Sequence, residues 1–180
     1  MKRIRIKMDT VESMLFYWQA TSEKDKVGET YLNEIANHED MKKTYDQEFN
    51  AESFRKVLSA ISNREPFKSD VKKERVFWNS NMWMTEDMEF TRMMLAPIKV
   101  LNADHLLPKV QAQVKNPKYE EVEVVFVPGH EFEYLIHENQ LLINFFKIQV
   151  DLYEDNKIEI GGVSLEDYLV NKMVEVQSQK

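Results

Sequence analysis

The chain has 180 residues, with 24 basic and 31 acidic side chains and no cysteine. A chain of this length can bury a sizeable core and fits one globular domain with, at most, a small extension. The composition excludes disulfides, thiol nucleophiles and cysteine-bound metals, and 4 scattered glycines do not form a dinucleotide fingerprint or a phosphate loop.

The charge distribution bears on partners and location. Residues 1–100 are balanced, so the whole net charge of −7 falls in residues 101–180. This acidic part repels phosphate backbones, so we expect no nucleic-acid partner. No apolar run reaches the length of a membrane span or of the apolar core of a signal peptide. We therefore expect a cytoplasmic protein of bacterial type with no membrane partner.

The N-terminal residues are predicted to form a strand followed by helices. Lys2–Lys7 alternates basic side chains with Ile4 and Ile6, which is typical of a charged edge strand whose isoleucines face inward. A first helix begins at Asp9 or Thr10. A second is expected over about 29–43, and its last residues are strongly polar.

Two further helices are expected before residue 100. Asn50 is a good N-cap, and Phe49 and Phe54 have the spacing of a hydrophobic staple, so a helix starts there and ends before Pro66. The next helix is predicted over about 85–96. Its apolar residues lie on most sides, which indicates a central position in the core.

Beyond residue 120 the apolar pattern changes to a period of two. The predicted strands are 121–127, 131–136, 141–153 and 157–160. A meander of these strands pairs Phe126 with Phe132, Ile136 with Leu142, and Leu152 with Ile158. The even-numbered side chains then share one buried face, and Glu131 and Glu133 lie on the other, more polar face.

A C-terminal helix follows Gly161 and Gly162, with Ser164 as its cap. The fold class is therefore α+β: N-terminal helices packed on one face of a four-stranded antiparallel β-meander, with a C-terminal helix. Residues 1–45 are an N-terminal helical segment, either an arm or part of the core, and residues 46–180 are the α+β domain.

Histidine and carboxylate side chains are the first candidates for chemistry. His130 and His137 bracket a predicted strand, so they lie roughly 23 Å apart and cannot share a metal. His38 and His105 are isolated in the sequence. We expect no metal and no cofactor. The glutamates of the strands belong to a solvated face, so we also expect no catalytic motif.

One segment resists a purely structural interpretation. Residues 75–84 combine tryptophan, methionine and asparagine, a mixture common at binding surfaces and also in loops that enter a core. Asn144 is the plainly polar residue on the apolar sheet face, and Tyr134 is expected beside it. The predicted ligand-binding residues are Trp78, Asn79, Asn81, Trp83, Tyr134 and Asn144.

These observations favour a binding or interaction module without catalysis, whose partner is an unknown small molecule or protein. The alternative is a cysteine- and cofactor-independent hydrolase or isomerase that uses a buried carboxylate with His105. Its candidate carboxylates are Glu86, Asp87 and Glu89. A third option is a self-associating protein, a homo-oligomer that uses residues 1–45 as its arm.

Overall fold

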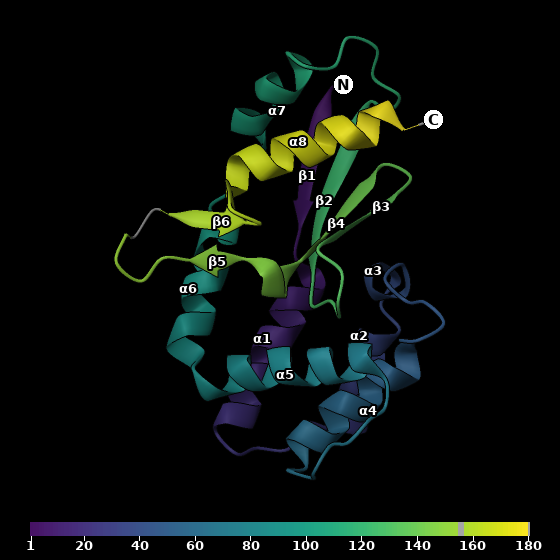
Figure 1. Ribbon diagram of the computed structural model, residues 1–180, viewed down its shortest axis with the longest axis vertical. Coiled ribbons are helices and arrows are strands. Elements are labelled where there is room, and N and C mark those ends of the chain that lie inside the picture. Colours follow the sequence, from purple (N-terminus) through teal and green to yellow (C-terminus); the bar gives the residue numbers. More distant parts are fainter. Residues whose placement is uncertain (155–156, 180) are drawn as a thin grey trace. The chain divides into compact units, whose positions relative to one another are not determined.

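The computed structural model describes residues 1–154 and 157–179 (Figure 1). In this part of the chain the fold is α+β, with eight α-helices and two sheets. No helix among these residues has both the length and the apolar character needed to cross a bilayer. The chain divides into two compact units. Unit 1 comprises Met1–Lys7, Arg92–Phe126 and Glu133–Lys180, and unit 2 comprises Met8–Thr91 and Val127–Phe132.

Unit 2 is helical. Its helices are α1 (Asp9–Ser22), α2 (Glu29–Ala36), α3 (Glu39–Lys42), α4 (Ala51–Ser62) and α5 (Lys72–Glu86), and it also holds the start of α6 (Met88–Lys99). Aromatic side chains form the centre of its core. The Phe77 ring lies 5.0 Å from Phe49 and 5.1 Å from Phe54, and all three are buried.

Helix α4 begins as its local sequence predicts. The Asn50 side chain accepts a hydrogen bond from the backbone N–H of Ser53 at 3.0 Å, and the Ser53 hydroxyl accepts one in return from the backbone N–H of Asn50. Phe49 and Phe54 are buried on either side of this cap, and the helix ends at Ser62, before Pro66. These reciprocal bonds satisfy N–H groups that the first turn leaves without partners.

The single helix predicted over 29–43 is divided in two. Helix α2 ends at Ala36, and α3 begins at Glu39 with His38 as its N-cap. The Nδ1 atom of His38 accepts a hydrogen bond from the backbone N–H of Asp40 at 3.1 Å. A side chain that bonds the local backbone in this way competes with continuation of a helix.

The prediction for residues 72–99 was wrong in its boundaries. Residues 75–84, expected ahead of a helix, lie within α5, and the helix predicted over 85–96 runs from Met88 to Lys99. Helix α5 buries Glu74, Phe77, Asn81 and Met84. Two of these four positions are polar, so the apolar periodicity that identifies a helix was incomplete.

Unit 1 contains a mixed sheet with strand order β1-β2-β4-β3 (Figure 1). Its strands are β1 (Arg3–Lys7), β2 (Glu121–Val127), β3 (Tyr134–His137) and β4 (Gln140–Asn144). Strand β1 pairs in parallel with β2, and β3 pairs antiparallel with β4. The predicted edge strand is confirmed, because β1 lies at one edge of the sheet with Ile4 buried.

The prediction of a four-stranded antiparallel meander was wrong. Strand β2 lies between β1 and β4, so it does not pair with β3, and Phe132 lies outside any strand, two residues before β3 begins. Strands β3 and β4 meet at a turn of two residues, in which Glu138 has a φ of 53°, and Leu135 rather than Ile136 opposes Leu142. All five residues of β4 are buried, so both of its faces are covered. Alternation therefore could not select a register, as is usual where strands are covered on both faces.

The long strand predicted over 141–153 is interrupted. A 3₁₀ turn over Phe145–Lys147 separates β4 from β5 (Gln149–Val150), which begins a second, antiparallel sheet with β6 (Ile158–Ile160) and β7 (Val163–Ser164). Val150, not Leu152, opposes Ile158. The interval between the last two predicted strands, 154–156, includes residues 155–156, which lie outside the described residues.

Unit 1 is completed by α7 (Ala103–Gln111) and α8 (Leu165–Ser178), and α8 crosses the mixed sheet (Figure 1). The predicted cap of the C-terminal helix is confirmed, since the Ser164 hydroxyl accepts a hydrogen bond from the backbone N–H of Asp167 at 3.3 Å. Gly161 and Gly162 form the turn between β6 and β7, with φ values of 57° and 80°.

This turn provides a stability prediction. We expect Gly161→Ala to lower the free energy of unfolding by about 1 kcal/mol, because an L-residue is strained in the left-handed region. The added Cβ would meet the Glu133 carboxylate at 3.5 Å, an ordinary contact, so the cost lies in the backbone. Urea unfolding measures it. Gly161→Asn is the comparison, because asparagine tolerates the left-handed region better than alanine does; an equal loss in both variants would contradict the explanation.

Candidate functional site

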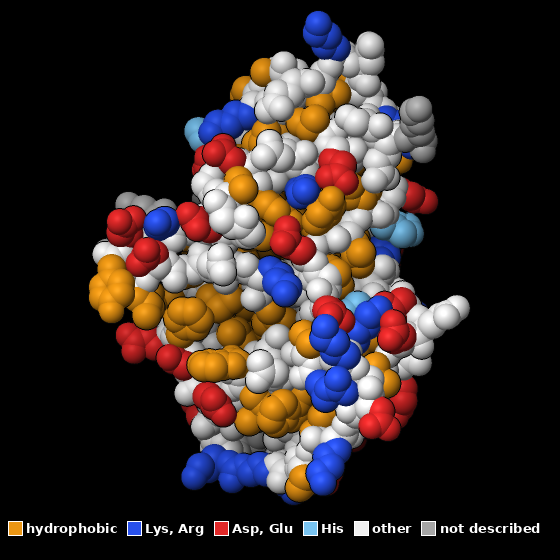
Figure 2. All heavy atoms as spheres, viewed as in Figure 1, with side chains coloured by type: hydrophobic (Ala, Val, Ile, Leu, Met, Phe, Trp, Pro, Cys, Tyr) orange, Lys and Arg blue, Asp and Glu red, His pale blue; other side chains and the backbone are white. Residues whose placement is uncertain are grey.

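A pocket of about 480 Å³ lies in unit 2, where the ends of α1 and α4 meet the second half of α5. Helix α5 contributes Trp78 and Met82 to its wall, and α1 and α4 contribute Thr21 and Ile61. On the face shown in Figure 2, hydrophobic side chains gather along α5, with Lys and Arg side chains beyond it at the lower edge. The volume falls within the range of small-molecule sites. We call it the α1/α4/α5 pocket.

Two cationic residues border this pocket in an unusual backbone conformation. Lys24 and Arg64 also line it, and they follow the C-terminal ends of α1 and α4 with φ values of 68° and 56°. Each is followed by a residue whose backbone N–H bonds back to the preceding helix, to Ala20 and Ala60 respectively, at 2.9 Å in both cases. Glycine is the usual residue at this position, because a Cβ is strained there. A cation in a strained left-handed conformation therefore stands at the border of the pocket at the end of each of the two helices, α1 and α4.

The pocket also carries acidic groups at its border. Glu65 and Glu86 line it together with the two cations. Neither Lys24 nor Arg64 forms an ion pair with another residue of the described chain. Both cationic groups therefore remain free to meet a ligand, while the apolar wall formed by Trp78 and Met82 supplies contact area.

The structure places four of the six predicted ligand-binding residues on α5. Trp78 is half-buried and lines the pocket, whereas Asn79 and Trp83 are exposed, Trp83 to 61%. Asn81 is fully buried. Its Oδ1 accepts a hydrogen bond from the indole N–H of Trp18, and its Nδ2 donates to the carbonyl of Phe77, both at 2.8 Å. The amide of Asn81 is thus used within the core.

The other two predicted residues belong to unit 1. The Asn144 side chain is buried and accepts a hydrogen bond from the backbone N–H of Phe146 at 3.1 Å, which caps the 3₁₀ turn. The Tyr134 hydroxyl donates to the Glu175 carboxylate at 2.9 Å. Unit 2 therefore does not by itself hold the six-residue cluster predicted from the sequence, and Trp78 is the member that its pocket contains.

The carboxylates of the enzymatic alternative are not buried. Glu86, Asp87 and Glu89 are exposed, and the Asp87 carboxylate accepts a hydrogen bond from the backbone N–H of Phe90 at the start of α6. His105 lies in unit 1 on α7, with its Nε2 3.3 Å from the carboxylate of Glu166. Acid–base catalysis requires a desolvated carboxylate, a condition that these three side chains do not meet.

The sequence indicated no functional role for His130, which is a buried histidine in unit 2. Its Nε2–H donates to the carbonyl of Thr44 at 3.0 Å, and its Nδ1 accepts from the backbone N–H of Glu131 at 2.8 Å. The ring lies 4.8 Å from that of Phe49. Burial lowers the pKa of His130 below its usual value, so the neutral form is the one that fits the fold.

This histidine makes stability depend on pH. The unfolded chain protonates a histidine below about pH 6.5, whereas folded His130 stays neutral to lower pH, so the unfolded state binds more protons and stability falls on acidification. We expect the free energy of unfolding to decrease between about pH 7.5 and about pH 5.5, and to decrease less in His130→Gln. Urea titrations across this range measure it. A wild-type slope in His130→Gln would contradict this explanation.

Among the described residues, one group of metal-ligating side chains lies together: Asp9, His38 and Asp40, all in unit 2. The sequence separated Asp9 from the other two by a whole helix and offered no motif that joins them. Comparison of the chain with protein-family models, with curated proteins and with solved structures finds no match.

Proposed function

We propose that the chain is a binding module without catalysis that takes a small aromatic anion into the α1/α4/α5 pocket. The observation that carries this proposal is an apolar wall of Trp78 and Met82 beside two cations, Lys24 and Arg64, in one pocket of about 480 Å³. An indole face offers stacking to a flat ring, and a thioether adapts to its edge. The cations supply the counter-charge for an anionic substituent.

The conformation of the two cations favours an anion over a neutral ligand. Glycine in place of Lys24 or Arg64 would relieve backbone strain at both helix ends, yet both positions hold long cationic side chains. Strain that the fold tolerates is often associated with function. A cation near a helix C-terminus also gains from the helix dipole, so only a binding measurement separates the two roles.

Titration with a fluorescent aromatic anion, anilinonaphthalene sulfonate, tests the proposal. We expect saturable binding at one site and a loss of affinity of about tenfold in Trp78→Ala, because the stacking surface is removed. Trp83→Ala is the matched control, since it deletes the same side chain from the same helix outside the pocket wall. Far-ultraviolet circular dichroism verifies that both variants are folded.

The outcomes are distinct. Equal affinity of both tryptophan variants for the probe would place its site elsewhere and contradict the proposal. A neutral analogue of similar shape, N-phenylnaphthylamine, separates the apolar contribution from the charge. The affinity for this neutral analogue should depend on Trp78, as that for the anion does, but not on Lys24 or Arg64.

A further inference from the structure

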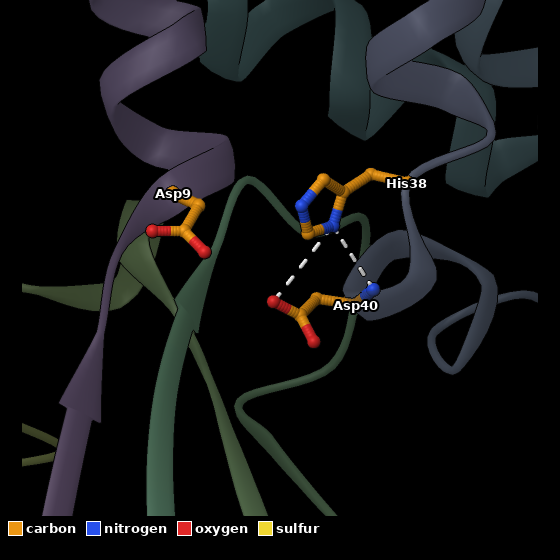
Figure 3. Close-up of side chains that lie close together, drawn as sticks. All are labelled: Asp9, His38 and Asp40. Atoms are coloured by element: carbon orange, nitrogen blue, oxygen red, sulfur yellow. Dashed lines mark hydrogen bonds and ion pairs between the residues drawn. The ribbon is translucent and has the colours of Figure 1, made fainter.

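We propose that Asp9, His38 and Asp40 bind one divalent transition-metal ion of the Zn²⁺ class. The three residues come from two places in the sequence. Asp9 is the first residue of α1, and His38 and Asp40 flank the start of α3. Their side chains point toward a common space in unit 2 (Figure 3).

The spacing of the ligand atoms suits a single ion. One atom from each residue lies within 4.8 Å of the other two. Bonds of about 2.1 Å in a tetrahedral site place ligand atoms about 3.4 Å apart. His38 Nδ1 lies 3.8 Å from Asp40 Oδ2, already near this value. Closure on an ion therefore requires a rotation of the exposed Asp9 side chain together with a turn of the His38 ring.

The chemistry of the donors selects the class of ion. Two carboxylates and one imidazole supply two oxygens and one nitrogen, and two ionised carboxylates balance the charge of a divalent cation. Imidazole favours Zn²⁺ and its transition-metal neighbours over Mg²⁺ and Ca²⁺, and the absence of thiolate disfavours Cu⁺. Three protein ligands leave a fourth position for water or another small ligand.

The three ligand side chains differ in how deeply they are buried. The Asp40 side chain is 1% exposed, that of His38 is 36% exposed, and Asp9 is exposed. The exposed Asp9 side leaves a path by which an ion enters, and Asp40 would fix the ion at the inner end.

The competing interpretation gives these residues structural roles only. His38 Nδ1 accepts the backbone N–H of Asp40 at 3.1 Å as the N-cap of α3, and Asp9 stands in the first turn of α1, where acidic residues are favourable. Binding through Nδ1 requires this nitrogen to turn from the N–H of Asp40 to the ion. The four-residue helix α3 is short enough to accommodate such an exchange at one end.

The test uses the full-length, tag-free protein, treated with a chelator and then freed of it. Isothermal titration with Zn²⁺ should show one site per chain, and Co²⁺ should produce visible absorption bands of a nitrogen–oxygen ligand set. His38→Gln should lower the affinity for Zn²⁺ by at least about a hundredfold, because even an outer partner of a metal ligand is worth about ten- to a hundredfold. Asp9→Ala should lower it by at least about tenfold.

Matched controls exist for both variants. Glu12→Ala removes the other acid of the first turn of α1, and His105→Gln removes a histidine from unit 1. Both should bind Zn²⁺ as the wild type does. Asp40→Asn is informative only if it stays folded, so the variants of Asp9 and His38 decide. If Zn²⁺ does not bind at one site per chain, or if its binding survives both of those variants, any binding is adventitious only and the proposal is overturned.

Discussion

Replacing Asn81 with leucine should lower the free energy of unfolding by about 2 to 3 kcal/mol. Leucine has the same branching and the same number of side-chain heavy atoms as asparagine, so no cavity is left and the loss comes mainly from hydrogen bonding. Asn81 accepts the indole N–H of Trp18 at 2.8 Å, and both side chains are fully buried. A buried donor that loses its acceptor costs about 1–3 kcal/mol, and the bond to the Phe77 carbonyl is lost as well.

Asn79→Leu is the control for this prediction. Asn79 lies two positions away on α5 and is exposed, so its replacement should change stability by less than about 0.5 kcal/mol. Urea unfolding followed by circular dichroism measures both variants. Equal effects at the two positions would mean that the Asn81 amide does not hold the Trp18 indole in the core.

A double-mutant cycle then isolates the pair. Trp18→Phe removes the donor while keeping an aromatic ring, so Asn81→Leu should cost less in that background than in the wild type. We expect a coupling energy of about 1–2 kcal/mol, typical of residues that share a buried hydrogen bond. Additive effects would show that the stability of Asn81 variants depends on packing alone.

The sequence was most informative where a few neighbouring residues determine the structure. The Asn50 cap of α4 and the Ser164 cap of α8 are set by contacts within a few residues, and both are confirmed, as is the edge strand that the alternation around Ile4 predicts. The order of the strands is not set in this way. Strand β2 pairs with β1, more than a hundred residues earlier, and no local pattern shows that partner.

Buried polar groups account for much of the remaining error. The helical period of α5 was hidden because Glu74 and Asn81 occupy buried positions, and β4 gave no alternation because both of its faces are covered. The same effect limited the prediction of the site. Asn81 was predicted as a ligand-binding residue because tryptophan and methionine surround it in the sequence, and an asparagine in such a segment equally indicates a core hydrogen bond.

The pocket itself could be anticipated only in part. Trp78 was named from composition, and it does line the α1/α4/α5 pocket. Lys24 and Arg64 were missed, because the sequence alone does not show that the C-terminal ends of α1 and α4, which carry these residues, both lie beside α5. A weak signal was present: neither α1 nor α4 is followed by a glycine at the position where helices commonly end with one.

The absence of glycine at these two helix ends leads to the second large prediction: glycine there should raise stability and weaken binding. The double variant Lys24→Gly, Arg64→Gly should raise the free energy of unfolding by about 1 to 2 kcal/mol, because two left-handed positions lose their strained Cβ atoms, and part of this gain is offset by the greater freedom of glycine in the unfolded chain. Urea unfolding measures the gain.

The same variant should bind anilinonaphthalene sulfonate at least about tenfold more weakly, since two cations at the mouth are removed and each is worth about 1 kcal/mol against an anion. Binding of the neutral N-phenylnaphthylamine should stay unchanged. Lys68→Gly serves as the comparison, because it removes a cation that does not line the pocket. A variant that gains stability while keeping its affinity for the anion would show that Lys24 and Arg64 serve only the helix ends. A loss confined to the anionic probe would support a binding role for both residues, since relief of backbone strain alone gives no reason to discriminate between probes by charge.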